Sequence, residues 1–343
     1  MLSTAAARPT SPVPAGSRQT ILRLTGIHAT TVIDGKPCDI LDDVSFSLQA
    51  GRMLGIVGES GCGKSMTALA IMGLMPKPQV TITAGSINFL GDELLDLPEN
   101  ELRLRRGAKM AMIFQEPSAS LNPVRTIGDQ MMEAIRAHRS IGRRQARETA
   151  LELLDRVRIR NPRHTIDDFP HRMSGGMCQR VSIAMALASR PKLLIADEPT
   201  TALDVSVQAQ ILELLATLQQ EEDLAVLLIS HDLGVVAGYA DEVAVMYAGK
   251  IVEQTQVDTL FAAPKHPYTM GLMRAAPRLG ARREMTRLEE IPGTVPALNA
   301  RPAGCAFVTR CRSAMARCTD VAPELKPVAT GHRVACLLQD RPS

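Results

Sequence analysis

The chain has 343 residues, a formal net charge of +3, and a composition that is 45% hydrophobic but only 3% aromatic. This length suits one α/β core with an appendage, or two domains, and the hydrophobic content can build a buried core. Few aromatic rings and little net charge are poor material for stacking on bases, so nucleic acid is not an expected partner. The chain contains no apolar run of about 18 residues, so we expect no membrane-spanning segment.

The N-terminal segment, residues 1–19, is rich in Ala, Pro and Ser and carries no acidic side chain. No apolar stretch follows its start, so it does not have the pattern of a secretory signal peptide. We expect a flexible tail. The composition leaves a transit peptide open as the alternative.

Two segments that follow, 21–50 and 84–94, alternate between apolar and polar side chains and contain turn-forming residues. This pattern predicts an antiparallel sheet beside the core. Between them, an apolar strand over 53–57 leads into a glycine-rich motif, and an apolar, helix-like run over 66–74 follows it.

The glycine-rich motif reads Gly-Glu-Ser-Gly-Cys-Gly-Lys-Ser over residues 58–65 and fits the phosphate-binding pattern G-x-x-x-x-G-K-[ST]. Its glycines let backbone N–H groups turn around phosphate oxygens, and the following helix N-terminus favours negative charge. Lys64 would neutralise the β- and γ-phosphates of ATP, and the Ser65 hydroxyl would bind Mg²⁺. The alternative is a glycine-rich turn without a ligand, which the strand before and the helix after disfavour. The expected nucleotide-binding residues of this loop are Gly58, Ser60, Gly61, Cys62, Gly63, Lys64 and Ser65.

Cys62 lies beside Lys64 and near a helix N-terminus, and both features lower the pKa of a thiol. We therefore expect a reactive thiol that bound MgATP protects from alkylation. The alternative is a small residue that only fills the loop.

The middle of the chain, from about 118 to 172, has apolar residues at helical spacing and predicts a group of helices. Basic clusters at 103–106 and 143–147 are expected to be solvated helix faces or contacts to a partner protein. Ser174 then opens another apolar-patterned helix, where it can act as an N-cap beside free backbone N–H groups.

Two acidic residues follow the apolar stretch 193–196, which has the pattern of a central parallel strand. The strand delivers Asp197 and Glu198 to the carboxyl edge of the sheet, where ligands of α/β proteins bind. Asp197 suits direct or indirect Mg²⁺ coordination, and Glu198 can polarise an attacking water. The alternative is an acidic pair that faces solvent. A helix over 205–218 and a strand over 224–229 come next, and that strand delivers His231.

These motifs together resemble those of the ABC-transporter ATPases over roughly residues 19–343. Residues 173–180, around Ser174-Gly175-Gly176, resemble the family signature. Gln115 resembles the Q-loop glutamine, Asp204 the D-loop aspartate and His231 the switch histidine. Met177 departs from the usual signature but resembles the peptide-importer branch.

The resemblance implies that ATP is held between the Walker motifs of one subunit and the signature loop of a second. Ser174, Gly175 and Gly176 would then contact the partner's ATP. It further implies Glu198, His231 and Gln115 as catalytic residues, Asp197 as a nucleotide-site residue, and Ser65 with Gln115 as Mg²⁺ ligands. Where the family usually has an adenine-stacking aromatic residue, this chain has His28, whose imidazole stacks less well.

The C-terminal part narrows the resemblance. The His-Pro-Tyr-Thr-Met-Gly-Leu motif at 266–272, with 291–296 and 304–307, is similar to oligopeptide, dipeptide and nickel importer ATPases. As a sequence the first motif is also a simple Pro-initiated helix. The sequence of the P-loop and the apolar run 68–74 resemble those of the first of the two ATPase subunits in peptide importers. A long cysteine-bearing tail favours peptide over nickel as the cargo.

The resemblance implies an ATP-hydrolysing subunit that powers import of di- or oligopeptides. Its partners would be a second ATPase subunit, giving a heterodimer, two integral-membrane permeases and, indirectly, an extracytoplasmic solute-binding protein. The chain would lie peripherally on the cytoplasmic face of the inner or plasma membrane. The alternatives are an ATPase for nickel or another small solute, a soluble ABC ATPase, and a non-catalytic regulator. The intact Glu198 and His231 argue against a regulator.

The expected fold is α/β: an ABC-type P-loop NTPase core with an antiparallel β subdomain, a helical subdomain and a cysteine-containing C-terminal extension. We expect the tail over 1–19, the ATPase domain over 20–254 with its helical subdomain at about 118–172, and the extension over 255–343.

Four of the seven cysteines lie in the extension, at Cys305, Cys311, Cys318 and Cys336. The segment is rich in proline and poor in large apolar residues, so we expect it to need a staple. Disulfides do not suit a protein that works on cytosolic ATP, and the close C-x₂₋₄-C pair usual for zinc is absent. Four thiolates can also hold a [4Fe–4S] cluster, which the resemblance to peptide-importer ATPases implies. Zinc and free buried thiols stay open.

Overall fold

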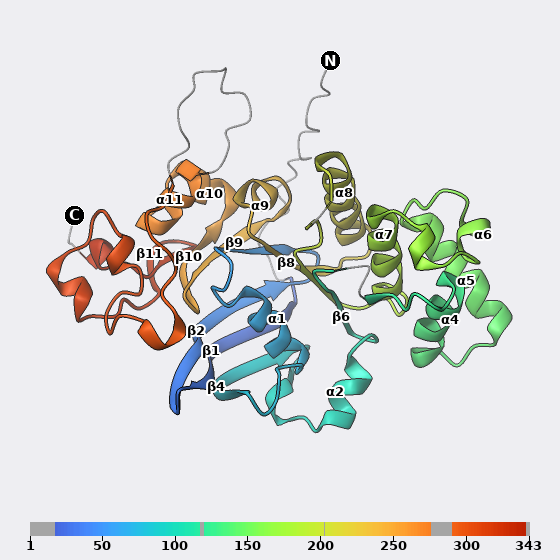
Figure 1. The fold of residues 1–343 in the computed structure, drawn as a ribbon, viewed down its shortest axis with the longest axis horizontal. Coiled ribbons are helices and arrows are strands. Elements are labelled where there is room, and N and C mark those ends of the chain that lie inside the picture. Colours follow the sequence, from blue (N-terminus) through green and yellow to red (C-terminus); the bar gives the residue numbers. More distant parts are fainter. Residues whose placement is uncertain (1–17, 117–119, 202, 276–289, 341–343) are drawn as a thin grey trace, which may run out of the picture.

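The computed structural model describes residues 18–116, 120–201, 203–275 and 290–340, and its elements form two sheets with helices around them (Figure 1). The predicted N-terminal tail lies almost wholly outside the described residues. No helix in these ranges combines the length and the apolar character that crossing a bilayer requires.

The smaller sheet is antiparallel and has the strand order β2-β1-β4-β5. Apolar residues on one side of it are buried; Leu24, for example, pairs with Phe46 on one neighbour and Ile87 on the other, and all three are buried. This confirms the antiparallel sheet that the alternating pattern predicted. Its strands are β1 (Thr20–Ile33), β2 (Lys36–Gln49), β4 (Val80–Phe89) and β5 (Asp92–Glu93).

The larger sheet has eight strands in the order β11-β12-β10-β9-β3-β8-β7-β6. The five from β9 to β6 are parallel neighbours, and every residue of β3, β7 and β8 is buried, as expected for strands covered on both faces. The parallel strands are β3 (Met53–Val57), β6 (Met110–Ile113), β7 (Leu193–Asp197), β8 (Ala225–Ser230) and β9 (Glu242–Tyr247). The antiparallel strands are β10 (Lys250–Gln256), β11 (Lys326–Ala329) and β12 (His332–Val334).

The longer helices gather around this sheet and at one end of the molecule (Figure 1). Helices α4, α5 and α6 of the helical subdomain pack together with α7 around Ile135, Leu154 and Val181, all fully buried. The helices of these two groups are α1 (Lys64–Met72), α8 (Val205–Glu221), α9 (Leu233–Tyr239), α10 (Val257–Ala262), α11 (Pro267–Ala275), α4 (Ile127–His138), α5 (Arg143–Arg156), α6 (Pro162–Thr165) and α7 (Gly175–Ala186).

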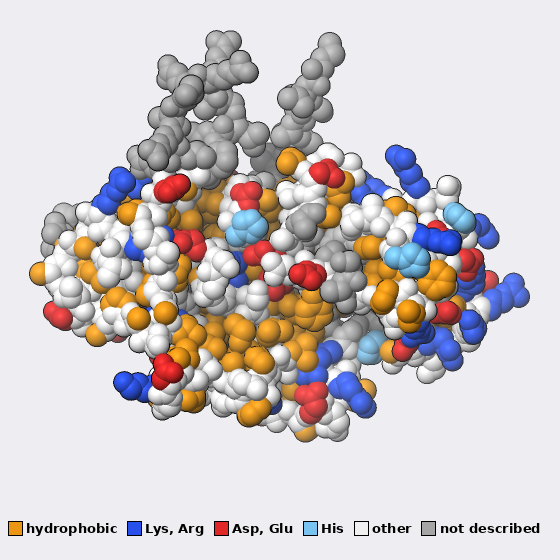
Figure 2. All heavy atoms as spheres, in the orientation of Figure 1, with side chains coloured by type: hydrophobic (Ala, Val, Ile, Leu, Met, Phe, Trp, Pro, Cys, Tyr) orange, Lys and Arg blue, Asp and Glu red, His pale blue; other side chains and the backbone are white. Residues whose placement is uncertain are grey.

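The two basic clusters differ in the structure. In the helical subdomain, the side chains of Arg143 and Arg144 are 78% and 94% exposed, and Lys and Arg side chains crowd this end of the surface (Figure 2). In α2 (Glu99–Arg105) and its cap, Arg103 is exposed as predicted, but the prediction of a solvated face is wrong for Arg105 and Arg106. Arg105 pairs with Asp92 of β5 at 2.8 Å, and the Arg106 guanidinium donates to the Met72 carbonyl at the end of α1, so the two side chains tie α2 to its neighbours.

The C-terminal segment is built mainly from 3-10 turns and joins the core by continuing its sheet, because β12 pairs with β10. A fully buried carboxylate, Glu253 on β10, holds this junction. It accepts the N–H groups of Lys265 and His266 at 2.7 and 2.9 Å, and the His332 ring nitrogen lies 2.8 Å away. The turns are η3 (Leu298–Ala300), η4 (Val308–Arg310), η5 (Ala316–Thr319) and η6 (Leu337–Asp340).

Candidate nucleotide site

The P-loop, residues 58–65, connects the buried strand β3 to α1 and is shaped by glycine. Gly63 has a φ of 106°, a left-handed conformation that side chains rarely adopt. A Cβ at Gly58 would lie 2.2 Å from the Met246 carbonyl oxygen, so only glycine fits there. The loop backbone is therefore free to follow a bound phosphate chain, as the motif predicted.

Lys64 begins α1 and is only 4% exposed. Its ammonium group donates to the carbonyl oxygens of Gly58 and Glu59 at 2.8 and 3.1 Å. The positive charge is thus held over the P-loop, where a phosphate would compete with these carbonyls.

The structure does not favour the reactive thiol that the neighbours of Cys62 predicted. The residue is 1% exposed, and burial raises the pKa of its thiol despite the opposing effect of Lys64. Desolvation of a thiolate outweighs one nearby cation here, because the thiol has lost nearly all contact with water.

The end of β7 faces the start of α1. The Ser65 hydroxyl donates to Asp197 at 3.1 Å. Asp197 is 5% exposed, and burial raises the pKa of its carboxyl, which the Ser65 hydrogen bond partly offsets. Two oxygen donors of this kind are the ligands that Mg²⁺ prefers.

At Glu198, the next residue, three side chains lie around one carboxylate oxygen. Its Oε2 accepts from Gln115 at 3.1 Å and from Thr201 at 2.9 Å, and His231 Nδ1 lies 3.3 Å from it. The backbone of Glu198 has a φ of 47°, which turns the chain sharply at the strand end. The structure therefore brings together the three residues that sequence reasoning had proposed as catalytic, and Thr201, which it had missed.

The signature segment lies against the start of α8. Ser174 caps α7 by accepting the Met177 N–H at 3.3 Å, and Asp204 caps α8 by accepting the Val207 N–H at 3.0 Å. A Cβ at Gly176 would lie 2.6 Å from Val207, so glycine lets the two helix starts approach closely. Both caps leave further N–H groups at the helix ends for an anion.

His28 lies on β1 with its side chain 37% exposed. Its Nδ1 is 3.7 Å from an Asp42 carboxylate oxygen. Adenine stacking at this residue stays a prediction.

The four cysteines of the C-terminal segment line one small cavity together with His266 and Phe307. Burial raises the pKa of Cys336 to about 11 and raises the pKa of Cys305 and Cys311 as well. Over residues 18–116, 120–201, 203–275 and 290–340, no three His, Cys, Asp or Glu side chains lie close enough to hold a single metal ion. The cysteines converge on one cavity, but not at the spacing of a mononuclear site.

Sequence reasoning missed the contacts between the P-loop and the C-terminal segment. The Glu59 N–H donates to the Tyr268 hydroxyl at 2.9 Å, and Arg310 pairs with the Glu59 carboxylate at 3.0 Å. Tyr268 belongs to the motif 266–272, which the sequence analysis related to importer ATPases and to a helix start but not to the P-loop. No local signal could have shown the partner, because Arg310 lies 251 positions from Glu59.

Comparison with known protein families finds two matched regions in this chain. Residues 41–201 match the ABC transporter family, and residues 252–318 match the oligopeptide/dipeptide transporter C-terminal region. A Sinorhizobium fredii protein named as a probable peptide ABC transporter ATP-binding protein is 51% identical over 86% of this chain and 88% of its own length. The dipeptide transport ATP-binding protein DppD of Escherichia coli is 48% identical over 88% of this chain and 92% of its own.

Solved structures agree on the fold. The dimeric structure of MJ0796, a bacterial ABC transporter cassette, superposes with a TM-score of 0.63 at 26% identity, covering 69% of this chain and 99% of that one. CbiO1 from Clostridium perfringens, part of an ABC transporter complex, gives a TM-score of 0.61 at 25% identity and covers 71% of this chain and 91% of that one. These matches confirm the predicted cassette fold.

Proposed function

Because the chain belongs to the ABC transporter ATP-binding proteins, we propose that it hydrolyses ATP to power the import of dipeptides or oligopeptides across a membrane. The observation that carries the proposal is the environment of Glu198, whose Oε2 lies within 3.3 Å of side-chain atoms of Gln115, Thr201 and His231. A carboxylate held by three neighbours is positioned to accept a proton from an attacking water. His231 and Gln115 would orient the γ-phosphate and that water.

ATP would bind along the P-loop, with backbone N–H groups of residues 58–65 around its phosphates and Lys64 between the β- and γ-phosphates. Ser65 and Asp197 fit a hard cation, because their oxygens lie 3.1 Å apart at the mouth of the loop. We assign Ser65 and Gln115 as Mg²⁺ ligands, with Asp197 beside them. When bound, Mg²⁺ neutralises charge that develops on the phosphates. His28 would face the adenine.

A second ATPase subunit would complete the site. Ser174, Gly175 and Gly176 present helix N–H groups at the start of α7, and in this proposal they bind the γ-phosphate of the partner's ATP. Closure of the two subunits then becomes a population shift that ATP drives. The similarity to a dimeric cassette structure supports this arrangement, and we propose a heterodimer of two related ATPases.

The transport partners follow from the peptide-importer relatives. We propose two integral-membrane permeases that the helical subdomain, about 118–172, contacts, and an extracytoplasmic solute-binding protein that delivers the peptide. The chain would sit peripherally on the cytoplasmic face of the membrane. The ATPase domain would span 20–254 and the extension 255–343, docked through the pairing of β12 with β10.

For the four cysteines we propose a [4Fe–4S] cluster with a structural role. Cys305, Cys311, Cys318 and Cys336 match such a group in number, and all four line one cavity. When bound, the cluster would supply the staple that this proline-rich segment otherwise lacks.

Anaerobic purification tests this assignment. The protein should be brown and contain iron and acid-labile sulfide, and Cys311→Ser should lose the colour. Cys38→Ser, at a buried cysteine outside the extension, is the control and should keep it. Stoichiometric zinc without iron would overturn the cluster, and a metal-free protein would overturn any metal at this site.

Glu198→Gln tests the ATPase assignment. The amide keeps the shape of the side chain but cannot accept the proton of water, so turnover should fall by about 10²–10⁴-fold while ATP binding is retained. The measurement is phosphate release by the chain assembled with its partner ATPase and permeases. Glu213→Gln, at an exposed position of α8, is the matched control and should keep normal turnover.

The same assay tests the composite site. The isolated chain should hydrolyse ATP slowly, and its rate should rise with protein concentration and with added partners. Wild-type turnover in Glu198→Gln would remove Glu198 from its role. Full turnover by a monomer at every concentration would overturn the two-subunit site.

A further inference from the structure

Glu59 is an acidic residue inside a loop that is otherwise built to attract phosphate. It is the second residue of the P-loop, and its side chain is 30% exposed. Its backbone carbonyl already accepts the Lys64 ammonium at 3.1 Å. A free carboxylate at this position would repel the phosphates of a nucleotide.

Arg310 of the C-terminal segment supplies the opposite charge. Its guanidinium lies 3.0 Å from the Glu59 carboxylate, and its side chain is only 4% exposed. It also donates to the carbonyl oxygens of Pro292 and Ile291 at 2.9 and 3.4 Å. Because the guanidinium side of this ion pair is shielded from water, the pair is screened less than one between two exposed side chains.

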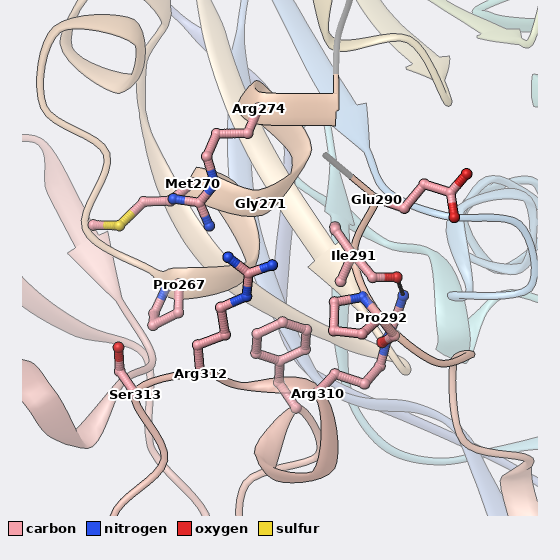
Figure 3. A pocket seen from close by; sticks show the side chains of 11 residues that line it. Pro267, Met270, Gly271, Arg274, Glu290, Ile291, Pro292, Arg310, Arg312 and Ser313 are labelled. Carbon is pink, nitrogen blue, oxygen red and sulfur yellow. Dashed lines mark hydrogen bonds between the residues drawn. The ribbon is translucent and has the colours of Figure 1, made fainter. Parts of the chain in front are cut away.

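The close view shows how Arg310 is aimed. Arg310 reaches toward Pro292, whereas Arg312, two residues on, points to Met270 and Arg274 (Figure 3). Arg310 and Arg312 both line a surface cavity of about 270 Å³. Its backbone ends the 3-10 turn η4, which Cys311 follows directly. The position of the guanidinium at the P-loop therefore depends on the fold of this segment.

Tyr268 makes the second contact. The residue is fully buried, and its hydroxyl accepts the Glu59 N–H at 2.9 Å. Its ring packs against Tyr247 and Phe307, with centroids 4.7 and 5.4 Å away. Since Phe307 also lines the cysteine cavity, one aromatic cluster joins that cavity to the P-loop.

We propose that Arg310 and Tyr268 are positioning residues for nucleotide binding, which hold Glu59 in place and cancel its charge so that the C-terminal extension sets the affinity of the P-loop. The loop is ordered before nucleotide arrives, so less conformational entropy is lost on binding. The inference rests on the proposed function, because it assumes that the nucleotide phosphates bind at this loop.

The experiment is the binding of MgADP to the full-length chain, measured by titration calorimetry. Arg310→Met should raise the Kd about tenfold, because it leaves the Glu59 charge unbalanced beside the phosphates. Tyr268→Phe should raise the Kd about threefold through the lost contact to the Glu59 N–H. In the assembled complex, KM for ATP should rise while kcat stays within about twofold, since neither residue reaches the reacting atoms.

Two matched variants control for the changes in composition. Arg317→Met removes an arginine of the same segment that pairs with Asp340, and Tyr239→Phe removes a hydroxyl that bonds to Ala209. Both should keep the wild-type Kd within about twofold. Arg310→Lys keeps the charge without the planar fork, so its Kd should fall between those of wild type and Arg310→Met.

A Glu59→Gln background separates the charge effect from damage to the fold. Once Glu59 is neutral, Arg310→Met should change the Kd less than threefold. An unchanged tenfold effect in that background, or an unchanged Kd in a folded Arg310→Met chain, would overturn the inference alone. If Arg310→Met does not fold, Arg310→Lys and Tyr268→Phe decide, and wild-type affinity in both would overturn it. A wild-type chain that fails to bind MgADP would overturn the proposed function as well.

Discussion

The nucleotide site and the four-cysteine cavity are built in opposite ways. In the first, the functional side chains follow the ends of parallel strands: Lys64 after β3, Glu198 after β7 and His231 after β8. In the second, the cysteines sit on loops and 3-10 turns with few ladder hydrogen bonds. The parallel sheet therefore positions the side chains of the nucleotide site, whereas the four-cysteine cavity depends on how the C-terminal segment docks on the core.

The docking contact at Glu253 gives the largest expected effect. Glu253→Gln puts an amide donor opposite buried N–H donors, so the free energy of unfolding should fall by about 3 kcal/mol. Urea unfolding measures the loss, and hydrogen exchange should show it first in β10 and β12. Glu324→Gln, whose side chain is 76% exposed, should change stability by less than 0.5 kcal/mol. Equal midpoints for the two variants would contradict a docked extension.

Lys64→Ala tests the nucleotide site, the first of the two regions compared. It removes the buried cation of the P-loop, so the Kd for MgATP should rise about 100-fold, or about 2.7 kcal/mol. Equilibrium binding of a fluorescent ATP analogue measures it. Lys326→Ala, at an exposed lysine of the extension, should bind as wild type does. Similar losses in both variants would show a general effect of charge rather than a site.

His266 makes the docked segment sensitive to acid. Burial lowers its pKa to about 3, whereas an unfolded histidine titrates near 6.5. Below pH 6.5 the His266 side chain therefore binds a proton in the unfolded chain but stays neutral in the folded chain. The free energy of unfolding falls as the pH drops toward 3. At pH 5 the loss from this residue should be about 2 kcal/mol.

Urea unfolding at pH 7 and pH 5 checks this prediction. His266→Gln should be less stable at pH 7 but should lose about 2 kcal/mol less than wild type between the two pH values. His171→Gln, at an exposed histidine, should keep the wild-type pH dependence. Parallel losses in wild type and His266→Gln would rule His266 out as the cause.

Cys62 gives the smallest expected effect. It tests whether neighbours in sequence or burial in the folded chain set the reactivity of its thiol. Its buried thiol, with a raised pKa, should react with a maleimide at least about tenfold more slowly in the folded chain than in urea, and MgATP should change that rate little. Peptide mapping by mass spectrometry measures both rates. Rapid labelling of Cys62 that MgATP blocks would contradict this expectation and support the reactive thiol predicted from the sequence.

The sequence implied the cassette fold only through the resemblance of its motifs to those of the ABC-transporter ATPases. By its residue pattern it predicted the antiparallel sheet, the parallel strands, and the order and proximity of Lys64, Asp197, Glu198 and His231. It could do so because strand, loop and helix follow each other within a few residues, and parallel strands bring their ends to one edge. Whether His28 stacks on adenine and whether Ser174 serves a partner stay predictions.

Only the tertiary structure decided the environments that depend on distant residues. It buried Cys62 and so raised its pKa, paired Arg105 with Asp92 and Arg106 with the Met72 carbonyl, and set Arg310 against Glu59 across 251 positions. It also continued the core sheet into the extension through β12. Burial and long-range pairing are properties of the packed chain, and the local pattern of residues does not encode which side chain will exclude water from which charge.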